Sequence, residues 1–177
     1  ILTSWKPPLP APGQGGEAPG SEGRRSDTPI FDLATLLAQV DAPQYGLVFG
    51  AVTRLVGDLQ GLSVLELGAE RGKIVQALRQ QGVNAQGVEL YPWLIEEARR
   101  QSVPIVQGTL VTVPDALRGQ TFHLTFSNLL LDALQTTEEA PDGTSLFRTL
   151  VGTERLKILE TIATLTVPEG WSIHLTQ

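Results

Sequence analysis

Residues 63–72 read SVLELGAERG, an apolar run that breaks into a glycine-rich turn. A second apolar segment, GVEL at residues 87–90, carries an acid near its end, Glu89. Glu89 follows Glu66 by 23 residues (89 − 66), about the length of one strand–helix–strand repeat. In α/β folds that hold nucleosides, the turn lets backbone amides approach the ligand and the next helix N-terminus supplies positive partial charge. The second acid pairs with ribose hydroxyls.

The hydrophobic pattern around this stretch alternates between strands and helices. We predict strands at 62–67, 84–90, 104–107, 121–127 and 171–176, and helices at 72–81, 92–101 and 145–165. Within 92–101, Glu96 can pair with Arg99 and Arg100, which favours an exposed helical face. Alternating strands and helices imply parallel pairing with right-handed crossovers. The predicted fold class is α/β, a doubly wound, mostly parallel five-stranded Rossmann-like sheet with helices on both faces.

The residues before this core divide into two parts. Residues 1–29 contain six of the twelve prolines and many glycines, which predicts a disordered or extended tail or linker. Trp5, close to two apolar residues, indicates that this tail lies along a partner or along its own domain. Residues 30–57 carry apolar residues at helical spacing and are expected to form two leading helices. With the core at 62–177 they make one domain, 30–177.

Composition excludes several classes of protein. The chain has 177 residues, 41% of them hydrophobic, enough for one domain with a core. A net charge of −6 argues against nucleic acid as a partner. With no cysteine and two histidines, no metal site is expected. No apolar run approaches the ~20 residues of a membrane span, and no signal peptide is evident, so the expected location is cytoplasmic. The chain begins at Ile1 and has no Met, which indicates a processed chain or a piece of a longer one.

The motifs, taken in order, resemble those of class I S-adenosylmethionine (SAM)-dependent methyltransferases. The matching segments are 64–72, 87–95, 103–108, 122–132 and 167–171, so that the resemblance covers about residues 62–177. It implies SAM as the cofactor, no metal, and methyl transfer to a small-molecule or protein acceptor.

The resemblance also implies roles for individual residues. Glu66 would orient the loop and the amino group of the cofactor, and Gly68 and Gly72 would form the loop. Glu89 would bind the ribose and Tyr91 would stack on adenine. The remaining candidates are Ser127 and Asn128, which would line the site at the end of the fourth strand, and Asp132, a candidate catalytic base. For each candidate residue an ordinary structural role is the alternative to ligand binding: a glycine needed by the turn, a solvated carboxylate or an aromatic ring packed on the sheet. For His174 we expect a structural role.

Three departures set this chain apart from the family. Glu70 replaces the middle glycine of the loop, where a side chain could pair with the ammonium of the cofactor but would repel its carboxylate. Thr109 replaces an acid that commonly contacts the adenine amino group. The sequence stops at Gln177, after the fifth strand, so a final helix and antiparallel hairpin would be missing. The chain thus resembles a degenerate, C-terminally truncated member.

These departures keep a second function open. The chain could be a catalytically inactive methyltransferase-like scaffold that contacts a protein partner through the N-terminal segment or an open sheet edge. The edge of the last strand must be covered, by the N-terminal segment or by another subunit. A nicotinamide-dependent oxidoreductase is disfavoured, because residues 68–72 do not match Gly-x-Gly-x-x-Gly. The sequence leaves enzyme and scaffold as alternatives.

Overall fold

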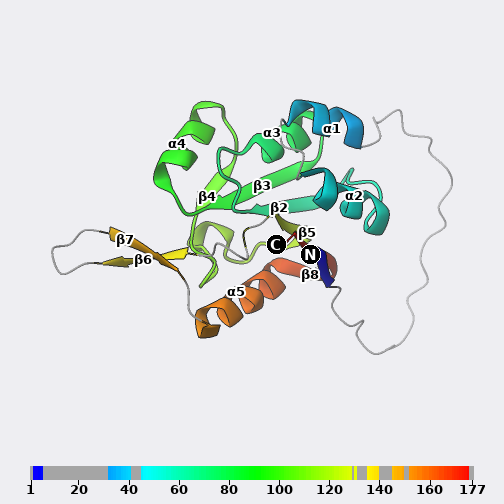
Figure 1. The fold of residues 1–177 in the computed structure, drawn as a ribbon. Coiled ribbons are helices and arrows are strands. Elements are labelled where there is room, and N and C mark those ends of the chain that lie inside the picture. Colours follow the sequence, from blue (N-terminus) through cyan, green and yellow to red (C-terminus); the bar gives the residue numbers. More distant parts are fainter. Residues whose placement is uncertain are drawn as a thin grey trace, which may run out of the picture.

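The structure is a computed structural model that describes residues 2–5, 32–40, 45–128, 130, 135–139, 145–149 and 152–175. Six strands form the main sheet in the order β1-β8-β5-β2-β3-β4 (Figure 1). Their bounds are β1 (Leu2–Trp5), β2 (Ser63–Leu67), β3 (Asn84–Glu89), β4 (Ile105–Gln107), β5 (Phe122–Asn128) and β8 (Thr166–Leu175). The last five pair in parallel, and β1 runs antiparallel to β8. The predicted doubly wound, mostly parallel sheet is confirmed.

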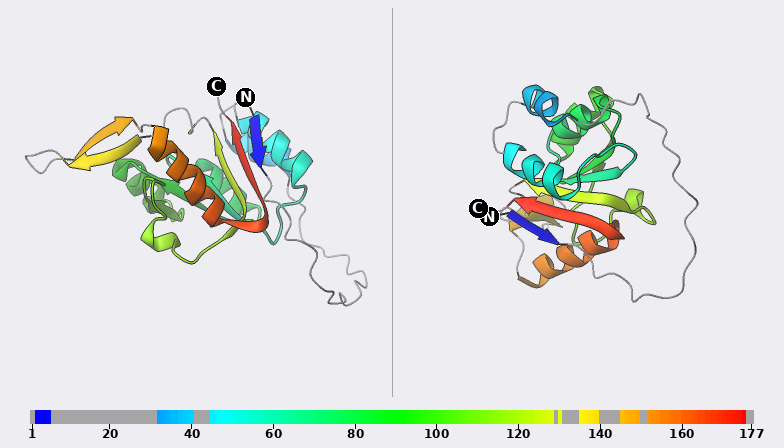
Figure 2. Two further views of the ribbon diagram at one scale, coloured as in Figure 1. Left: turned by 90° about the horizontal axis from the view of Figure 1, so that it is seen from below. Right: turned by 90° about the vertical axis from the view of Figure 1, so that its right-hand side faces the viewer.

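Helices cover both faces of this sheet, as Figure 2 shows. On one face lie α1 (Leu33–Gln39), α2 (Tyr45–Leu55), α3 (Lys73–Gln80) and α4 (Pro92–Arg100), and on the other lie α5 (Gly152–Leu165) and a short 3-10 helix (Asp115–Leu117). No helix in the described part of the chain combines the length and hydropathy needed to cross a bilayer.

Alternation along the strands gives the sheet two separate cores. In β2, Val64 packs with the cluster under α1–α4, whereas Leu65 and Leu67 pack with the cluster under α5. On the first face, the rings of Phe49 in α2 and Phe126 in β5 meet edge to face, with their centroids 5.2 Å apart. The leading helices are therefore part of the domain core, and they place the start of α2 near the end of β5.

The N-terminal strand covers the edge of β8. Its register runs from Leu2 opposite Leu175 to Trp5 opposite Ser172. In Figure 2 the two strands lie side by side. Of the two covers considered for this edge, the structure shows the chain's own N-terminal residues. The rest of the predicted tail lies outside the described residues, and the domain division at residues 29 and 30 stays a prediction.

The segment after β5 differs from the sequence prediction. The helix expected at 145–165 begins only at Gly152, and Ser145–Thr149 instead form β7, which pairs with β6 (Gln135–Glu139) in an antiparallel hairpin. The hairpin projects away from the main sheet in Figure 1. Its sequences, QTTEE and SLFRT, include threonines and a phenylalanine, which favour strands over helices.

The last strand is longer than predicted. It begins at Thr166 rather than at residue 171, and its pairing with β5 passes from Phe122 opposite Thr166 to Leu124 opposite Trp171. Between these two pairs β5 has one residue, His123, whereas β8 has four, residues 167–170. Residues 168–170 lie within this irregularity of the strand.

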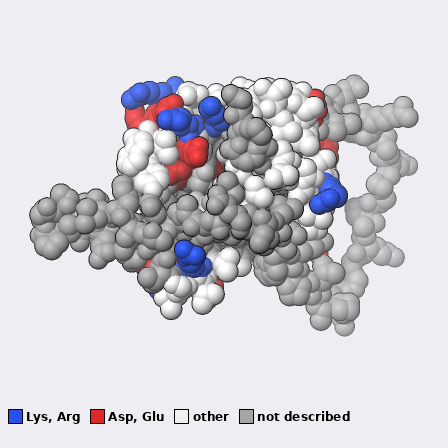
Figure 3. Space-filling model, in the orientation of Figure 1, with Lys and Arg blue, Asp and Glu red and all other residues white. Residues whose placement is uncertain are grey.

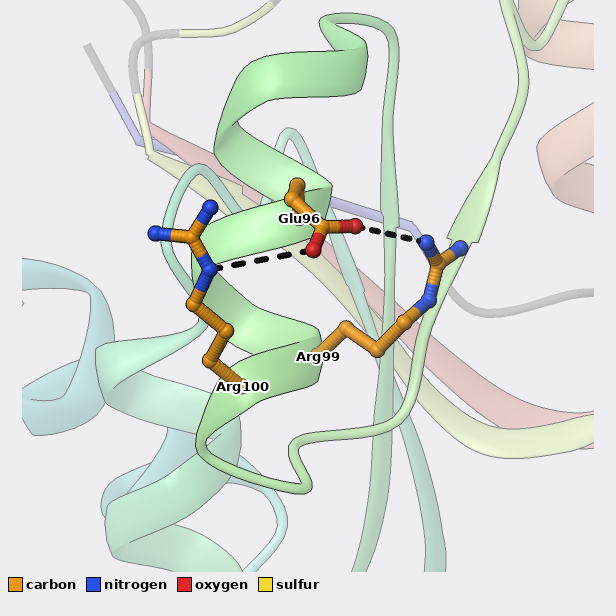
Figure 4. A network of polar contacts seen from close by, with 3 residues as sticks. All are labelled: Glu96, Arg99 and Arg100. Atoms are coloured by element: carbon orange, nitrogen blue, oxygen red, sulfur yellow. Dashed lines mark hydrogen bonds and ion pairs between the residues drawn. The ribbon is translucent and has the colours of Figure 1, made fainter.

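The exposed face of α4 carries the expected ion pairs (Figure 4). The carboxylate of Glu96 lies 2.8 Å from Nη1 of Arg99 and 3.7 Å from Nε of Arg100. Basic and acidic side chains lie next to one another at this corner of the molecule in Figure 3. Because all three side chains are well exposed, these pairs contribute little to stability.

Candidate functional site

The loop between β2 and α3 requires glycine at two positions. Gly68 has a φ of 72° and Gly72, the N-cap of α3, has a φ of 74°. A Cβ atom on Gly68 would lie 2.9 Å from Cδ1 of Leu130, and one on Gly72 would lie 2.7 Å from side-chain atoms of Ile105 and Val103. Backbone conformation and packing therefore both demand these glycines, whether or not a ligand binds.

Glu89, at the end of β3, anchors this loop. Its Oε2 accepts a hydrogen bond from the Glu70 N–H (2.8 Å), and its Oε1 accepts from the N–H groups of Leu90 (2.7 Å) and Tyr91 (3.0 Å). The residue is only 5% exposed. A carboxylate has about four acceptor positions. One position on Oε2 is thus left for a ligand hydroxyl.

Glu66, at the end of β2, is the most strongly perturbed acid near the loop. It is 2% exposed. Burial raises its pKa well above the usual value, and the charges of Glu70 and Glu89 act in the same direction. Hydrogen bonds from the Val75 N–H, in the first turn of α3, and from the Tyr45 hydroxyl oppose this effect. The carboxyl group therefore favours its protonated form, and within the described residues its Oε2 has no hydrogen-bond partner.

The sequence did not single out Tyr45, the first residue of α2. Its hydroxyl interacts with the side chains of Glu66 and Asn128, and burial followed by the charges of Glu66 and Glu70 raises its pKa. Asn128 ends β5, and its Oδ1 is buried without a partner among the described residues. The sequence signal for Tyr45 is a phenol at the start of a mostly apolar helix.

Glu70 adopts a backbone conformation that usually requires glycine. Its φ is 47°, in the left-handed region, and its side chain is exposed. Its N–H is held by Glu89, whereas its charge acts on Glu66. A side chain at this position is therefore accommodated at some cost in backbone strain, and it adds negative charge to the site.

The two residues with expected adenine contacts lie beside Glu89. The ring of Tyr91 packs on that of Trp93, with centroids 4.7 Å apart and an interplanar angle of 32°. Thr109 follows Gly108, whose N–H donates to the carbonyl of Glu89 (3.0 Å). The Thr109 hydroxyl accepts a weak hydrogen bond from the Val111 N–H (3.3 Å). Asp132, the candidate base, lies outside the described residues.

Ser127 belongs to a buried polar network on the opposite face of the sheet. His174 in β8 contacts Ser127 Oγ through Nδ1 (2.8 Å) and Ser172 Oγ through Nε2 (2.6 Å). Thr125 donates to Ser172 (3.0 Å). Burial lowers the pKa of His174 to about 4, so the ring is neutral at pH 7. We assign the proton to Nδ1, which donates to Ser127, while Ser172 donates to Nε2.

Successive residues of a strand point to opposite faces. Ser127 therefore lies with His174 on the α5 face, whereas Asn128 lies on the other face, where its side chain hydrogen-bonds the Tyr45 hydroxyl. The structure brings together Tyr45, Glu66, Glu70, Glu89 and Asn128 at the carboxyl ends of β2, β3 and β5 and separates Ser127 from them. Within the described ranges no group of three acidic or histidine side chains is placed to hold a metal ion.

A concave feature lies away from this cluster. A polar cavity of about 360 Å³ lies between α1, α3 and α4. It is lined by Gln39, Arg71, Lys73, Gln76, Ala77, Gln80, Glu97 and Gln101. Arg71 Nε and Glu97 Oε2 form an ion pair of 2.7 Å there. The cavity carries none of the residues singled out above.

Comparison with known proteins places the fold. No protein-family model matches the chain, and no curated protein is significantly similar to it. Among solved structures, a SAM-bound amino pentose methyltransferase from Micromonospora echinaspora superposes with a TM-score of 0.55 and 14% identity, over 76% of this chain and 50% of that one. A sugar N-methyltransferase from a Streptoalloteichus species gives a TM-score of 0.54 and 17% identity, over 92% and 60%.

A glycopeptide N-methyltransferase complexed with sinefungin gives a TM-score of 0.51 and 16% identity, over 71% of this chain and 50% of that one. The chain therefore spans between 50% and 60% of the length of these three proteins. At such low identity the likeness establishes the fold, which is the Rossmann-like fold of class I SAM-dependent methyltransferases.

Proposed function

We propose that this chain binds SAM at the carboxyl ends of β2, β3 and β5 and transfers its methyl group to a small molecule or protein. The observation that carries the proposal is the arrangement of Glu89, which holds the glycine-rich loop and keeps one acceptor position for a ribose hydroxyl. The residues also fit such a ligand elsewhere. The Val75 N–H, in the first turn of α3, donates to Glu66, so the N-terminus of this helix, with its positive partial charge, lies at this end of the sheet.

Each residue at the site has a proposed part in binding. Glu89 accepts a ribose hydroxyl, and Glu66 faces the amino group of the ligand. Tyr91 and Thr109, which lie beside Glu89, line the site of the adenine. Asn128 lines the methyl-transfer side at the end of β5. Ser127, which lies on the opposite face, supports the end of β5 through His174 and is not proposed to touch the ligand.

The chemistry demands little of the protein. SAM, when bound, supplies a methyl group already activated by its sulfonium. The residues of the chain position the acceptor in line with that methyl group and exclude water, which supplies most of the rate. Asp132, outside the described residues, is proposed as a base for acceptors that must lose a proton. A cytoplasmic location is part of the proposal, and fractionation of cells expressing a tagged chain checks it.

The second candidate is an inactive scaffold with the same fold. Glu70 favours it, because a strained, charged residue stands in the loop where the family has glycine. The partner would be a protein that contacts the N-terminal segment. The two edge strands of the main sheet are β1, in the N-terminal segment, and β4. The edge of β4 is therefore a second place where a partner strand could pair.

Titration calorimetry with SAM and S-adenosylhomocysteine tests the proposal. We expect micromolar binding by the native chain and a loss of at least about tenfold in Glu89→Gln, which removes an acceptor for the ribose and for the loop. Glu96→Gln, the same change in an exposed ion pair of α4, is the matched control and should bind as the native chain does. Urea unfolding of each variant checks that it is folded.

The outcomes separate the two candidates. No heat from the native chain, with binding restored by Glu70→Gly, would indicate a scaffold whose pocket has decayed. No heat from any variant would refute SAM binding.

A further inference from the structure

Two buried polar atoms without a partner belong to side chains that share one hydroxyl group as a neighbour. Within the described residues, the buried side-chain polar atoms that lack a hydrogen-bond partner are Glu66 Oε2 and Asn128 Oδ1. Both side chains interact with the hydroxyl of Tyr45. An unsatisfied buried acceptor costs free energy, so native proteins seldom keep one without a reason. A ligand group rich in N–H donors would satisfy both.

The charge around these atoms has one sign. The charges of Glu70, in the loop, and Glu89, at the end of β3, both act on Glu66, at the end of β2. None of the ion pairs among the described residues involves these three glutamates. The nearby Arg71 pairs with Glu97 of α4, with half of its side chain exposed. The site therefore favours a cation.

The titratable groups that face Glu66 are Glu70 in the loop, Glu89 on β3 and Tyr45 on α2. None of them is a cation. An arriving ammonium group would supply the missing positive charge and favour ionised Glu66. Binding would then release the proton that Glu66 holds in the empty site.

We propose that the cluster of Tyr45, Glu66, Glu70 and Asn128 takes a primary ammonium group and discriminates against a carboxylate beside it. Within the adenosyl site proposed above, on which this inference rests, the chain would prefer decarboxylated SAM to SAM. Both ligands carry the same nucleoside and the same sulfonium methyl group. They differ only in the carboxylate, which would enter a site that already holds Glu66 and Glu70. Glu70 is thus the residue that sets the preference.

Calorimetry with three ligands tests this inference: SAM, decarboxylated SAM and 5′-methylthioadenosine, which has neither the ammonium group nor the carboxylate. We expect decarboxylated SAM to bind about tenfold more tightly than SAM, the effect of one like charge brought close in a partly screened site. Glu70→Gly and Glu70→Gln should bring the ratio of the two affinities towards one. Glu96→Gln should leave it unchanged.

The number of protons released on ligand binding is measured by repeating the titrations in buffers of different ionisation enthalpy. Decarboxylated SAM should release up to about one proton on binding, and Glu66→Gln should abolish that release. Methylthioadenosine should release none, since it brings no cation to Glu66.

The possible results distinguish this inference from the function it rests on. Binding of methylthioadenosine together with equal affinities for SAM and decarboxylated SAM would overturn the preference and leave the nucleoside site standing. An unchanged ratio in both Glu70 variants would also overturn it, because Glu70 would then have no part in selection. Failure of all three ligands to bind the native chain would refute both proposals.

Discussion

Replacing Gly72 by alanine should destabilise the fold through two separate effects. The left-handed backbone at a φ of 74° costs an alanine about 1–2 kcal/mol. The new Cβ would also lie 2.7 Å from side-chain atoms of Ile105 and Val103, and relieving such an overlap costs about 1–3 kcal/mol more. We therefore expect Gly72→Ala to lower the free energy of unfolding by about 3 kcal/mol.

Gly61 provides a matched control for the first effect. Its φ is 75°, and a Cβ built on it meets nothing within 4 Å. Gly61→Ala should thus cost only the backbone term, about 1–2 kcal/mol. The difference between the two variants isolates the overlap at Gly72.

Urea unfolding followed by circular dichroism, at one pH and without ligand, measures both variants. If Gly72→Ala and Gly61→Ala are destabilised equally, within about 0.5 kcal/mol, the packing argument at Gly72 is wrong. If neither variant loses stability, the loop does not need glycine for folding. Gly72 would then be explained only by the approach of a ligand.

Three other predictions concern charge and the sheet edge. Burial lowers the pKa of His174 from 6.5 to about 4. The unfolded chain therefore takes up a proton on this group at a higher pH than the folded chain does. As a result, the free energy of unfolding decreases as the pH is lowered below about 6.5. The gap in unfolding free energy between the native chain and His174→Gln should therefore narrow by about 1.4 kcal/mol from pH 8 to pH 5.5, and a constant gap would contradict the burial argument. Glu96→Ala should change stability by less than about 0.5 kcal/mol, and a larger loss in urea would show that its exposed pairs matter. Removing β1 (Leu2–Trp5) should expose the edge of β8 and promote association, measured by light scattering against concentration; a variant that stays monomeric would show that the edge is otherwise protected.

Local patterns sufficed for the elements of the core. The run that becomes β2, the glycine at its end and the acid that closes β3 were all recognisable in the chain, because strand–turn–helix units carry strong short-range signals. The boundaries of α3 and α4 fall within one residue of those predicted. The apolar spacing of residues 145–165 predicts one helix and no hairpin, although a strand-forming segment precedes Gly152.

Within the site, sequence indicated Glu66, Gly68, Gly72 and Glu89 as candidates, but not their contacts. Glu89 accepts three hydrogen bonds from backbone N–H groups because the loop folds back towards its carboxylate. Tyr45 was not foreseen, because helical periodicity shows which face of α2 is apolar but not which strand end its first residue meets. Ser127 and Asn128 were grouped by adjacency, and the pleat of β5 separates them.

The sequence by itself determined the order of the five parallel strands, the α/β class and the glycine-rich turn between two acids, since these depend on residues close in the chain. Only the tertiary structure decided that the N-terminal residues pair with β8 and that Tyr45, Glu66 and Asn128 meet. Such contacts join segments far apart in sequence. They are selected by burial and edge pairing across the whole domain, which no local pattern encodes.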